Sequence, residues 1–391
     1  MEKFVIEIDD KYACVKESEE VCGIKEAVEN FINLIVTEVQ KEDERFAIDL
    51  IQSGGTYENT KVIQQDEFDF LASLKAFQKA PKDEVNFLVV PRSNVHASIK
   101  LCDAQLESLW SDMVSTEDDA KWLDSSKMKS HFNDLVVKAV GSVKSTENLK
   151  FITTQTKSWS NSKLLAGCVS FQPPEVFTFL WKDNLKISVD LVPFVNCSKN
   201  NLTGYLKDLV SDTSSIQSKF LVDNLGVVGR FGPFWRLSYS QAETSIFQYL
   251  AKEYEYVLVH YRVLKYLNET HFVTKDNFPV HLCSTYVFKN AVLHAWYQNR
   301  SSDNIHKFLI KETLNYMIEC YGKGYLATFF NPNTNVLKDG DHTYTINAIK
   351  ECLVQLENDT SLDTFVQSRV VIQEKQGISL RDRKVKKISS M

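Results

Sequence analysis

Apolar residues recur at helical spacing over residues 24–46, and glutamate and lysine occupy the opposite face. The apolar positions are Ile24, Val28, Phe31, Ile32, Ile35 and Val39. This spacing predicts a long amphipathic helix that ends near Gln40–Arg45, where charged residues crowd together. The same periodicity predicts a second helix from about Ser125 to Val143.

Alternation of polar and apolar residues predicts strands around these helices. The alternating segments are Lys61–Ile63 continuing through Glu67–Leu71, Val85–Val90, Val95–Leu101, Glu175–Trp181 and Lys186–Val192. From Gln241 onwards helical patterns dominate, as over Ile246–Leu267, Val287–Trp296 and Phe308–Cys320. We therefore expect an α+β, bilobed fold. A mixed β-sheet lobe with a long spine helix would span residues 1–240, and a helical lobe with a basic tail residues 241–391.

Composition is that of a soluble globular protein, with 43% hydrophobic and 25% charged residues. No apolar run reaches the roughly 18 residues that a membrane span needs, and the acidic N-terminus lacks the apolar stretch of a signal peptide. The eight cysteines are scattered singly without metal-ligand spacing. We expect a cytoplasmic protein with reduced thiols, no zinc site and no membrane contact.

The net charge of −6 gives no overall signal for nucleic-acid binding. Basic residues do gather in the tail from Lys375 to Lys387, where a solvated terminus is the plainer interpretation. On the predicted helix at 24–46, acidic residues outnumber Lys25 and Lys41.

Two carboxylates stand two residues apart on one predicted strand. Glu67 and Asp69 point to the same face, whereas Phe68 and Phe70 are expected to enter the core. Asp190, expected to end a second alternating strand, would complete a group of three that can hold two Mg²⁺ ions about 3.5–4 Å apart. The Ser53-Gly54-Gly55-Thr56 turn before the first strand would bring backbone N–H groups near phosphate oxygens. A solvated strand face and an ordinary turn explain the same residues.

The order of these features resembles the cyclic GMP-AMP synthase (cGAS) family. GGTYENTKVIQQDEFDFL is similar to that family's Gly-Ser turn and Glu-x-Asp strand, and LKISVDLVPFV to the strand with its third acid. WLDSSKMKSHFNDLV resembles the helix between its sheet strands. FWRLSYSQAE and CSTYVFKNAVLHAW resemble its nucleotide-closing and Ser-Tyr-x-x-Lys segments, and YLATFFNPNTNVL its C-terminal element. These matches follow the family's order from about residue 24 to residue 338.

The resemblance implies a bilobed nucleotidyltransferase that makes a cyclic dinucleotide from ATP and GTP with two Mg²⁺ or Mn²⁺ ions. Glu67, Asp69 and Asp190 would be the catalytic and metal-binding residues, with Asp190 as the base-like acid. The acceptor nucleotide would be contacted by Arg236, Ser238, Ser240 and Glu243, the last of these expected at the end of the strand. Lys265 would contact the donor triphosphate. The remaining implied nucleotide contacts are Ser53, Gly54, Gly55, Thr56, Ser284, Thr285, Lys289 and the base-stacking Tyr286.

Two departures from the family pattern bear on function. Gly55 replaces the family's serine, for which Thr56 or Ser53 would have to substitute, and the His/Cys zinc insertion of the vertebrate DNA sensor is absent after Glu243. The pattern therefore resembles the zinc-less cGAS-like receptors of invertebrates. Double-stranded RNA is the implied activator in innate immune sensing, ahead of double-stranded DNA, with assembly on the activator a further expectation. A catalytically silent scaffold and a linear-product transferase resembling oligoadenylate synthase are the alternatives.

Overall fold

The computed structural model describes residues 2–78, 85–143, 146–155, 175–212, 214–230, 232–270 and 283–358. The chain forms two compact units. Val15–Glu253 and Phe330–Thr334 make up the sheet unit, and Met1–Cys14, Tyr254–Phe329 and Asn335–Met391 make up the helical unit. The mixed sheet and the helical C-terminal region confirm the predicted fold class. The basic tail from Lys375 to Lys387 lies outside the described residues.

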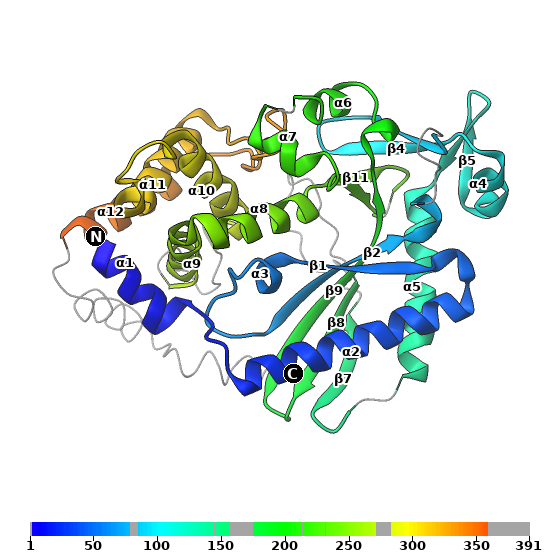
Figure 1. Ribbon diagram of the computed structural model, residues 1–391, viewed down its shortest axis with the longest axis horizontal. Helices are drawn as coiled ribbons and strands as arrows, with labels where there is room; N and C mark the ends of the chain where they lie inside the picture. Colours follow the sequence, from blue (N-terminus) through cyan, green and yellow to red (C-terminus); the bar gives the residue numbers. More distant parts are fainter. Residues whose placement is uncertain are drawn as a thin grey trace. The chain divides into compact units, whose positions relative to one another are not determined.

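The described part of the sheet unit contains eleven strands in one curled, mixed sheet (Figure 1). The strands are β1 (Ile48–Ser53), β2 (Glu67–Leu74), β3 (Phe87–Pro91), β4 (His96–Leu101), β5 (Val114–Glu117), β6 (Ala120–Leu123), β7 (Leu149–Gln155), β8 (Glu175–Trp181), β9 (Leu185–Asn196), β10 (Gly226–Val228) and β11 (Trp235–Ser238). The main path runs β1-β2-β9-β10-β11-β4-β6-β5, with β3 beside β4 and the β7–β8 pair beside β9. Only β2 and β9 pair in parallel among these described strands.

The described α-helices of the sheet unit are α2 (Glu19–Glu42), α3 (Gly54–Tyr57), α4 (Ala104–Leu109), α5 (Ser125–Ser142), α6 (Tyr205–Leu209), α7 (Ile216–Leu221) and α8 (Ser240–Glu253). Figure 1 shows α2 passing along the β7–β9 part of the sheet, and Phe31 on α2 packs edge-on against Phe179 on β8. The apolar stripe predicted on α2 is buried.

Two predicted element bounds need correction, and a third is confirmed. The spine helix spans Glu19–Glu42 rather than 24–46, because the Ser18 hydroxyl caps it by accepting the N–H of Val21, and its last predicted residues form a short 3₁₀ turn. The segment from Lys61 to Asp66 is not part of β2, since Ile63 adopts a positive φ of 70° that ends extended backbone. The predicted start at Ser125 is confirmed, because the Asp124 carboxylate caps α5.

The helical unit is built from α1 (Glu2–Ile8), a π-helical turn (Asp9–Ala13), α9 (Glu255–Thr270), α10 (Thr285–Asn299), α11 (Ile305–Lys323) and α12 (Thr343–Asn358). Helices α9, α10 and α11 pack against one another, and α12 packs on α11. The N-terminal residues join this unit through a buried ion pair in which the Arg262 guanidinium donates to both oxygens of Asp9, at 2.8 and 2.5 Å. None of the helices within the described ranges is long and apolar enough to cross a membrane.

Candidate functional site

The acids proposed from the sequence lie on neighbouring parallel strands of the sheet unit. Asp69 of β2 and Asp190 of β9 are register partners, and Glu67 is paired with Ser188 two residues earlier. Side chains alternate along a strand, so the three carboxylates share one face of the sheet. As predicted, Phe68 and Phe70 are fully buried on the other face. We expected Asp190 at the end of its strand. It lies instead in the middle of β9, which continues to Asn196.

Gly54 lies directly against the Asp69 carboxylate. A Cβ atom at position 54 would stand 1.8 Å from Oδ2 of Asp69, and the backbone φ of +76° is itself one that favours glycine. Instead of the plain turn expected from the sequence, residues Gly54–Tyr57 form a single helical turn, α3. The glycine at this position therefore lets the chain turn and leaves room for the carboxylate.

The Thr56 hydroxyl is committed to holding α3 on β2. It donates to the carbonyl oxygen of Glu67 at 2.7 Å and accepts from the Gln65 side-chain amide at 2.5 Å. Ser53, whose register partner is Asp69, is buried before α3 and makes no side-chain cap hydrogen bond there. Of the two hydroxyls considered as substitutes for the missing serine, that of Thr56 already has a donor and an acceptor.

Tyr57 connects α3 to the spine helix. Its hydroxyl donates to the Glu29 carboxylate at 3.0 Å, and its ring packs edge-on against Phe68 and Phe70. Burial first, and then the Glu29 charge and hydrogen bond, raise the pKa of Tyr57, so that it remains a neutral donor. The α3 turn is thus held from three sides: by β2, by α2 and by the core.

Glu67 is held by a lysine. The Lys61 ammonium lies 2.8 Å from Oε2 of Glu67 and 2.9 Å from Oδ1 of Asp66. Burial alone would lower the pKa of Lys61, but the Glu67 and Asp66 charges and hydrogen bonds outweigh it and raise that pKa. Lys61 therefore stays charged beside the acidic face, a contact that the sequence pattern did not suggest.

The acidic face has the oxygen donors that Mg²⁺ and Mn²⁺ prefer. Across the described ranges, however, no three His, Cys, Asp or Glu side chains are gathered closely enough to hold a metal ion together. The Glu67 carboxylate is turned to the Lys61 ammonium. The strand register brings the three acids to one face, and Glu67 would have to leave Lys61 to bind a metal ion there.

The implied acceptor residues lie across the same sheet. Arg236 and Ser238 are on β11, and the Ser238 hydroxyl donates to that of Ser240 at 3.2 Å. We expected Glu243 at the end of a strand. It is instead buried in the first turn of α8, because the chain becomes helical at Ser240.

Arg236 stands in a cluster of basic side chains. It is the register partner of His96 on β4, and the His96 ring contacts the Arg230 guanidinium. Burial, and then the charges of Arg230 and Arg236, lower the pKa of His96. The positive charge of this cluster therefore comes from the two arginines, because the His96 imidazole stays neutral near pH 7.

A buried asparagine that the sequence analysis missed fixes Tyr239, the residue between the two serines. Asn331 is completely buried, and its amide donates to the Tyr239 hydroxyl at 2.9 Å and to the Asn94 carbonyl at 3.2 Å. Phe330 stacks on the Tyr239 ring. The Thr334 hydroxyl also donates to the Asn94 carbonyl, at 2.8 Å. The Phe330–Thr334 segment resembles a family element, but its residue pattern alone does not indicate that Asn331 contacts Tyr239, nearly a hundred residues earlier.

The remaining predicted residues form a separate group within the helical unit. The Lys265 ammonium lies 5.5 Å from the ring centroid of Tyr261, whose hydroxyl donates to the Thr285 carbonyl at 3.3 Å. Ser284 caps α10 by accepting the N–H of Val287, and Tyr286 and Lys289 follow on that helix, both half-buried. Lys265 and the start of α10 are therefore brought together, through Tyr261.

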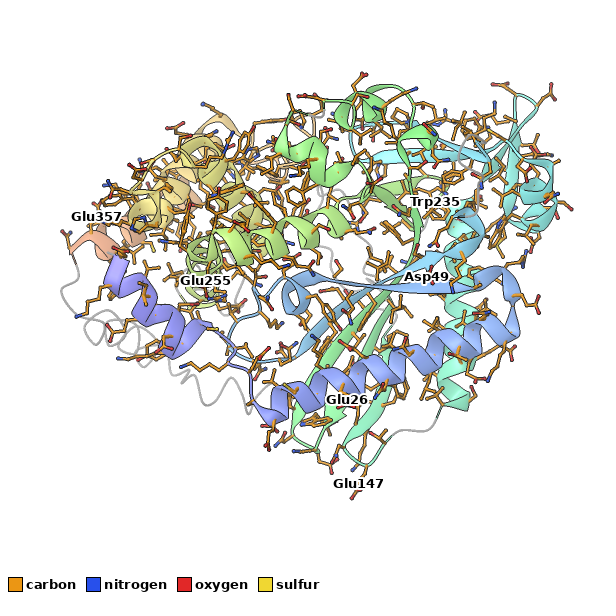
Figure 2. The ribbon with its side chains drawn as sticks, viewed as in Figure 1. Glu26, Asp49, Glu147, Trp235, Glu255 and Glu357 are labelled. Atoms are coloured by element: carbon orange, nitrogen blue, oxygen red, sulfur yellow. The ribbon has the colours of Figure 1, made fainter. Side chains whose placement is uncertain are left out.

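The spine helix does not present a basic surface. Lys41 pairs with Glu38 at 2.6 Å, and Lys25 lies over the Tyr57 ring at 5.2 Å from its centroid. Exposed acids such as Glu26 occupy the outer face (Figure 2). A phosphate backbone would meet like charge on this face.

Two family models match the chain in succession. The Mab-21 protein nucleotidyltransferase domain matches residues 56–249, and the Mab-21 protein HhH/H2TH-like domain matches residues 259–356. Together they cover about three quarters of the chain. The first match contains all three acids of the site, and the second contains Lys265 and α10.

Proposed function

The chain belongs to the Mab-21 nucleotidyltransferase family, and we propose that its reaction joins ATP and GTP into a cyclic dinucleotide of the cyclic GMP-AMP type. The observation that carries this proposal is the direct register pairing of Asp69 with Asp190 on parallel strands, with Glu67 on the same face. Acids so placed suit a phosphoryl transfer in which charge on phosphate oxygens must be neutralised.

Nucleotidyltransferase domains generally use divalent metal ions, and Glu67, Asp69 and Asp190 would hold Mg²⁺ or Mn²⁺ here. The chemistry that such ions supply is activation of the attacking hydroxyl and neutralisation of the triphosphate. Asp190 lies in mid-strand, where its backbone is fixed by neighbours on both sides, and would accept the proton of the attacking ribose hydroxyl. The absence of a side chain at Gly54 would leave room for a phosphate beside Asp69.

The other residues are assigned to nucleotide binding. Arg236, Ser238, Ser240 and Glu243 would contact the acceptor nucleotide; the two hydroxyls are already mutually oriented. In the helical unit, Lys265 would contact the donor triphosphate and Tyr286 would stack on a base. Ser284, Thr285 and Lys289 would flank that base. In the sheet unit, Ser53 would contact a phosphate beside Asp69, and Thr56 would do so only by leaving the Glu67 carbonyl and Gln65.

Activation by double-stranded RNA in innate immunity, with oligomerisation on the RNA, is proposed from the family resemblance alone. An RNA contact would be expected on a surface other than α2, because Lys41 pairs with Glu38 and exposed acids such as Glu26 occupy the outer face of this helix.

The test is product analysis with radiolabelled nucleotides. Purified protein is incubated with all four NTPs and Mg²⁺ or Mn²⁺, without ligand, with double-stranded RNA or with double-stranded DNA. A phosphatase-resistant dinucleotide containing both bases is the expected product, appearing with RNA. A linear oligonucleotide would favour the oligoadenylate-synthase-like alternative. Complete absence of product under all conditions, with Mn²⁺ bound, would favour the silent scaffold.

A further inference from the structure

Lys61 stands between two acids of very different exposure. Its side chain is 14% exposed, that of Asp66 is 28% exposed and that of Glu67 is 57% exposed. The lysine is therefore held in place by its surroundings, while Glu67 reaches it from the solvent side. An exposed glutamate side chain can change partner at little cost, because few contacts restrain it.

The second partner of Lys61 is anchored independently. Asp66 accepts the Gln64 side-chain amide on Oδ2 at 2.7 Å and meets Lys61 with Oδ1. Asp66 also precedes β2, so it is not one of the alternating residues on the acidic face. If Glu67 turned away, Lys61 would keep an anchored counter-charge.

From this arrangement we infer that Lys61 is a built-in competitor for the metal ligand Glu67. In the metal-free protein its ammonium neutralises Glu67 and relieves the repulsion between Glu67 and Asp69. To bind a divalent cation together with Asp69 and Asp190, Glu67 would have to leave the ammonium, and Lys61 would remain with Asp66. Metal affinity is thereby set below what the three acids alone would give. The inference rests on the proposed function, because it takes these acids as the metal site.

The experiment measures Mn²⁺ binding to the nucleotide-free protein by electron paramagnetic resonance. Lys61→Met removes the competitor and should lower the Mn²⁺ Kd about fivefold. Lys61→Arg keeps a cation and should stay within about twofold of the wild type. The matched control is Lys186→Met, which removes an equal charge from an exposed position on neighbouring β9. If Lys186→Met lowers the Mn²⁺ Kd as much as Lys61→Met does, the effect comes from the general loss of positive charge, and direct competition by Lys61 is wrong.

A second variant is expected to act in the opposite direction. Asp66→Asn leaves Glu67 as the charged partner of Lys61 in this ion-pair cluster, so it should raise the Mn²⁺ Kd. In the Lys61→Met background the same change should have no more than about a twofold effect, because the shared lysine is gone. Equal effects of Asp66→Asn in both backgrounds would contradict the inference.

Failure of the inference is distinguishable from failure of the proposed function. If Asp69→Asn and Asp190→Asn abolish Mn²⁺ binding while Lys61→Met leaves the Kd unchanged, the metal site stands and the competitor role is wrong. If Asp69→Asn and Asp190→Asn bind Mn²⁺ like the wild type, the metal site itself is wrong.

Discussion

The α-carbon of Gly54 lies so close to the Asp69 carboxylate that a Cβ atom there would be 1.8 Å from Oδ2. Gly54→Ala must therefore displace Asp69 or the α3 turn, and its φ of +76° adds a strain of about 1 kcal/mol. We expect nucleotidyl transfer to fall about 100-fold, as misplacement of a reacting group by an ångström does. Initial rates of dinucleotide formation measure the loss.

Gly141→Ala is the matched control for this substitution. Gly141 lies near the end of α5, and a Cβ there meets nothing within 4 Å. The protein should keep its activity and gain up to about 1 kcal/mol of unfolding free energy, because alanine favours helix. Equal loss of activity in both variants would argue against a specific steric role for position 54.

Asn331→Ala is expected to loosen the acceptor segment. The change removes the amide that donates to the Tyr239 hydroxyl and one of the two donors to the Asn94 carbonyl, and should lower the unfolding free energy by about 1–3 kcal/mol. Because Tyr239 separates Ser238 from Ser240, the KM for nucleotide should also rise. Urea unfolding and steady-state kinetics measure the two effects.

The control for Asn331 is Asn224→Ala, whose amide donates to the Phe220 carbonyl within the same unit. That variant should leave the KM unchanged. If Asn331→Ala destabilises the protein without changing the KM, Asn331 is structural and does not position the acceptor residues.

Local features of the site followed from the sequence, whereas its long-range pairings did not. Alternation placed Phe68 and Phe70 in the core and Glu67 with Asp69 on the opposite face. The pairing of Asp69 with Asp190 joins strands about 120 residues apart, and no local pattern sets such a register. The Asn331–Tyr239 contact likewise depends on tertiary packing.

The element ends that differed from prediction have local causes. Strand β9 continues past Asp190 through Pro193, a residue that usually interrupts central strands, and the Pro193 carbonyl accepts the Gly229 N–H. Helix α2 starts early because Ser18 supplies its cap. The ion pair between Asp9 and Arg262 could not be predicted, since isolated charged residues do not indicate their partners.

Acidification should destabilise the protein through His260. Its Nε2–H donates to the His306 carbonyl, and burial lowers its pKa from 6.5 to about 4, against the weaker opposing effects of that bond and of Glu2. The folded state thus binds this proton less readily than the unfolded state, so stability is fully present above pH 6.5 and falls as the pH drops towards 4. At pH 5 the loss from this group is about 2 kcal/mol relative to pH 7.

His260→Gln keeps an amide donor but does not titrate. Urea unfolding at pH 7 and pH 5 should therefore show a smaller pH-dependent loss in the variant than in the wild type. The same loss in both proteins would assign the acid sensitivity to other groups.

The most direct test of the central claim compares isosteric changes at acids on the same sheet. Asp69→Asn and Asp190→Asn should each lower the rate of nucleotidyl transfer at least about 1,000-fold with unchanged circular dichroism and unfolding midpoint. Asp49→Asn, at an exposed acid on β1 that pairs with Lys75 (Figure 2), should stay within about twofold of the wild type. Transfer at the wild-type rate by either Asp69→Asn or Asp190→Asn would contradict the assignment of this face as the active site.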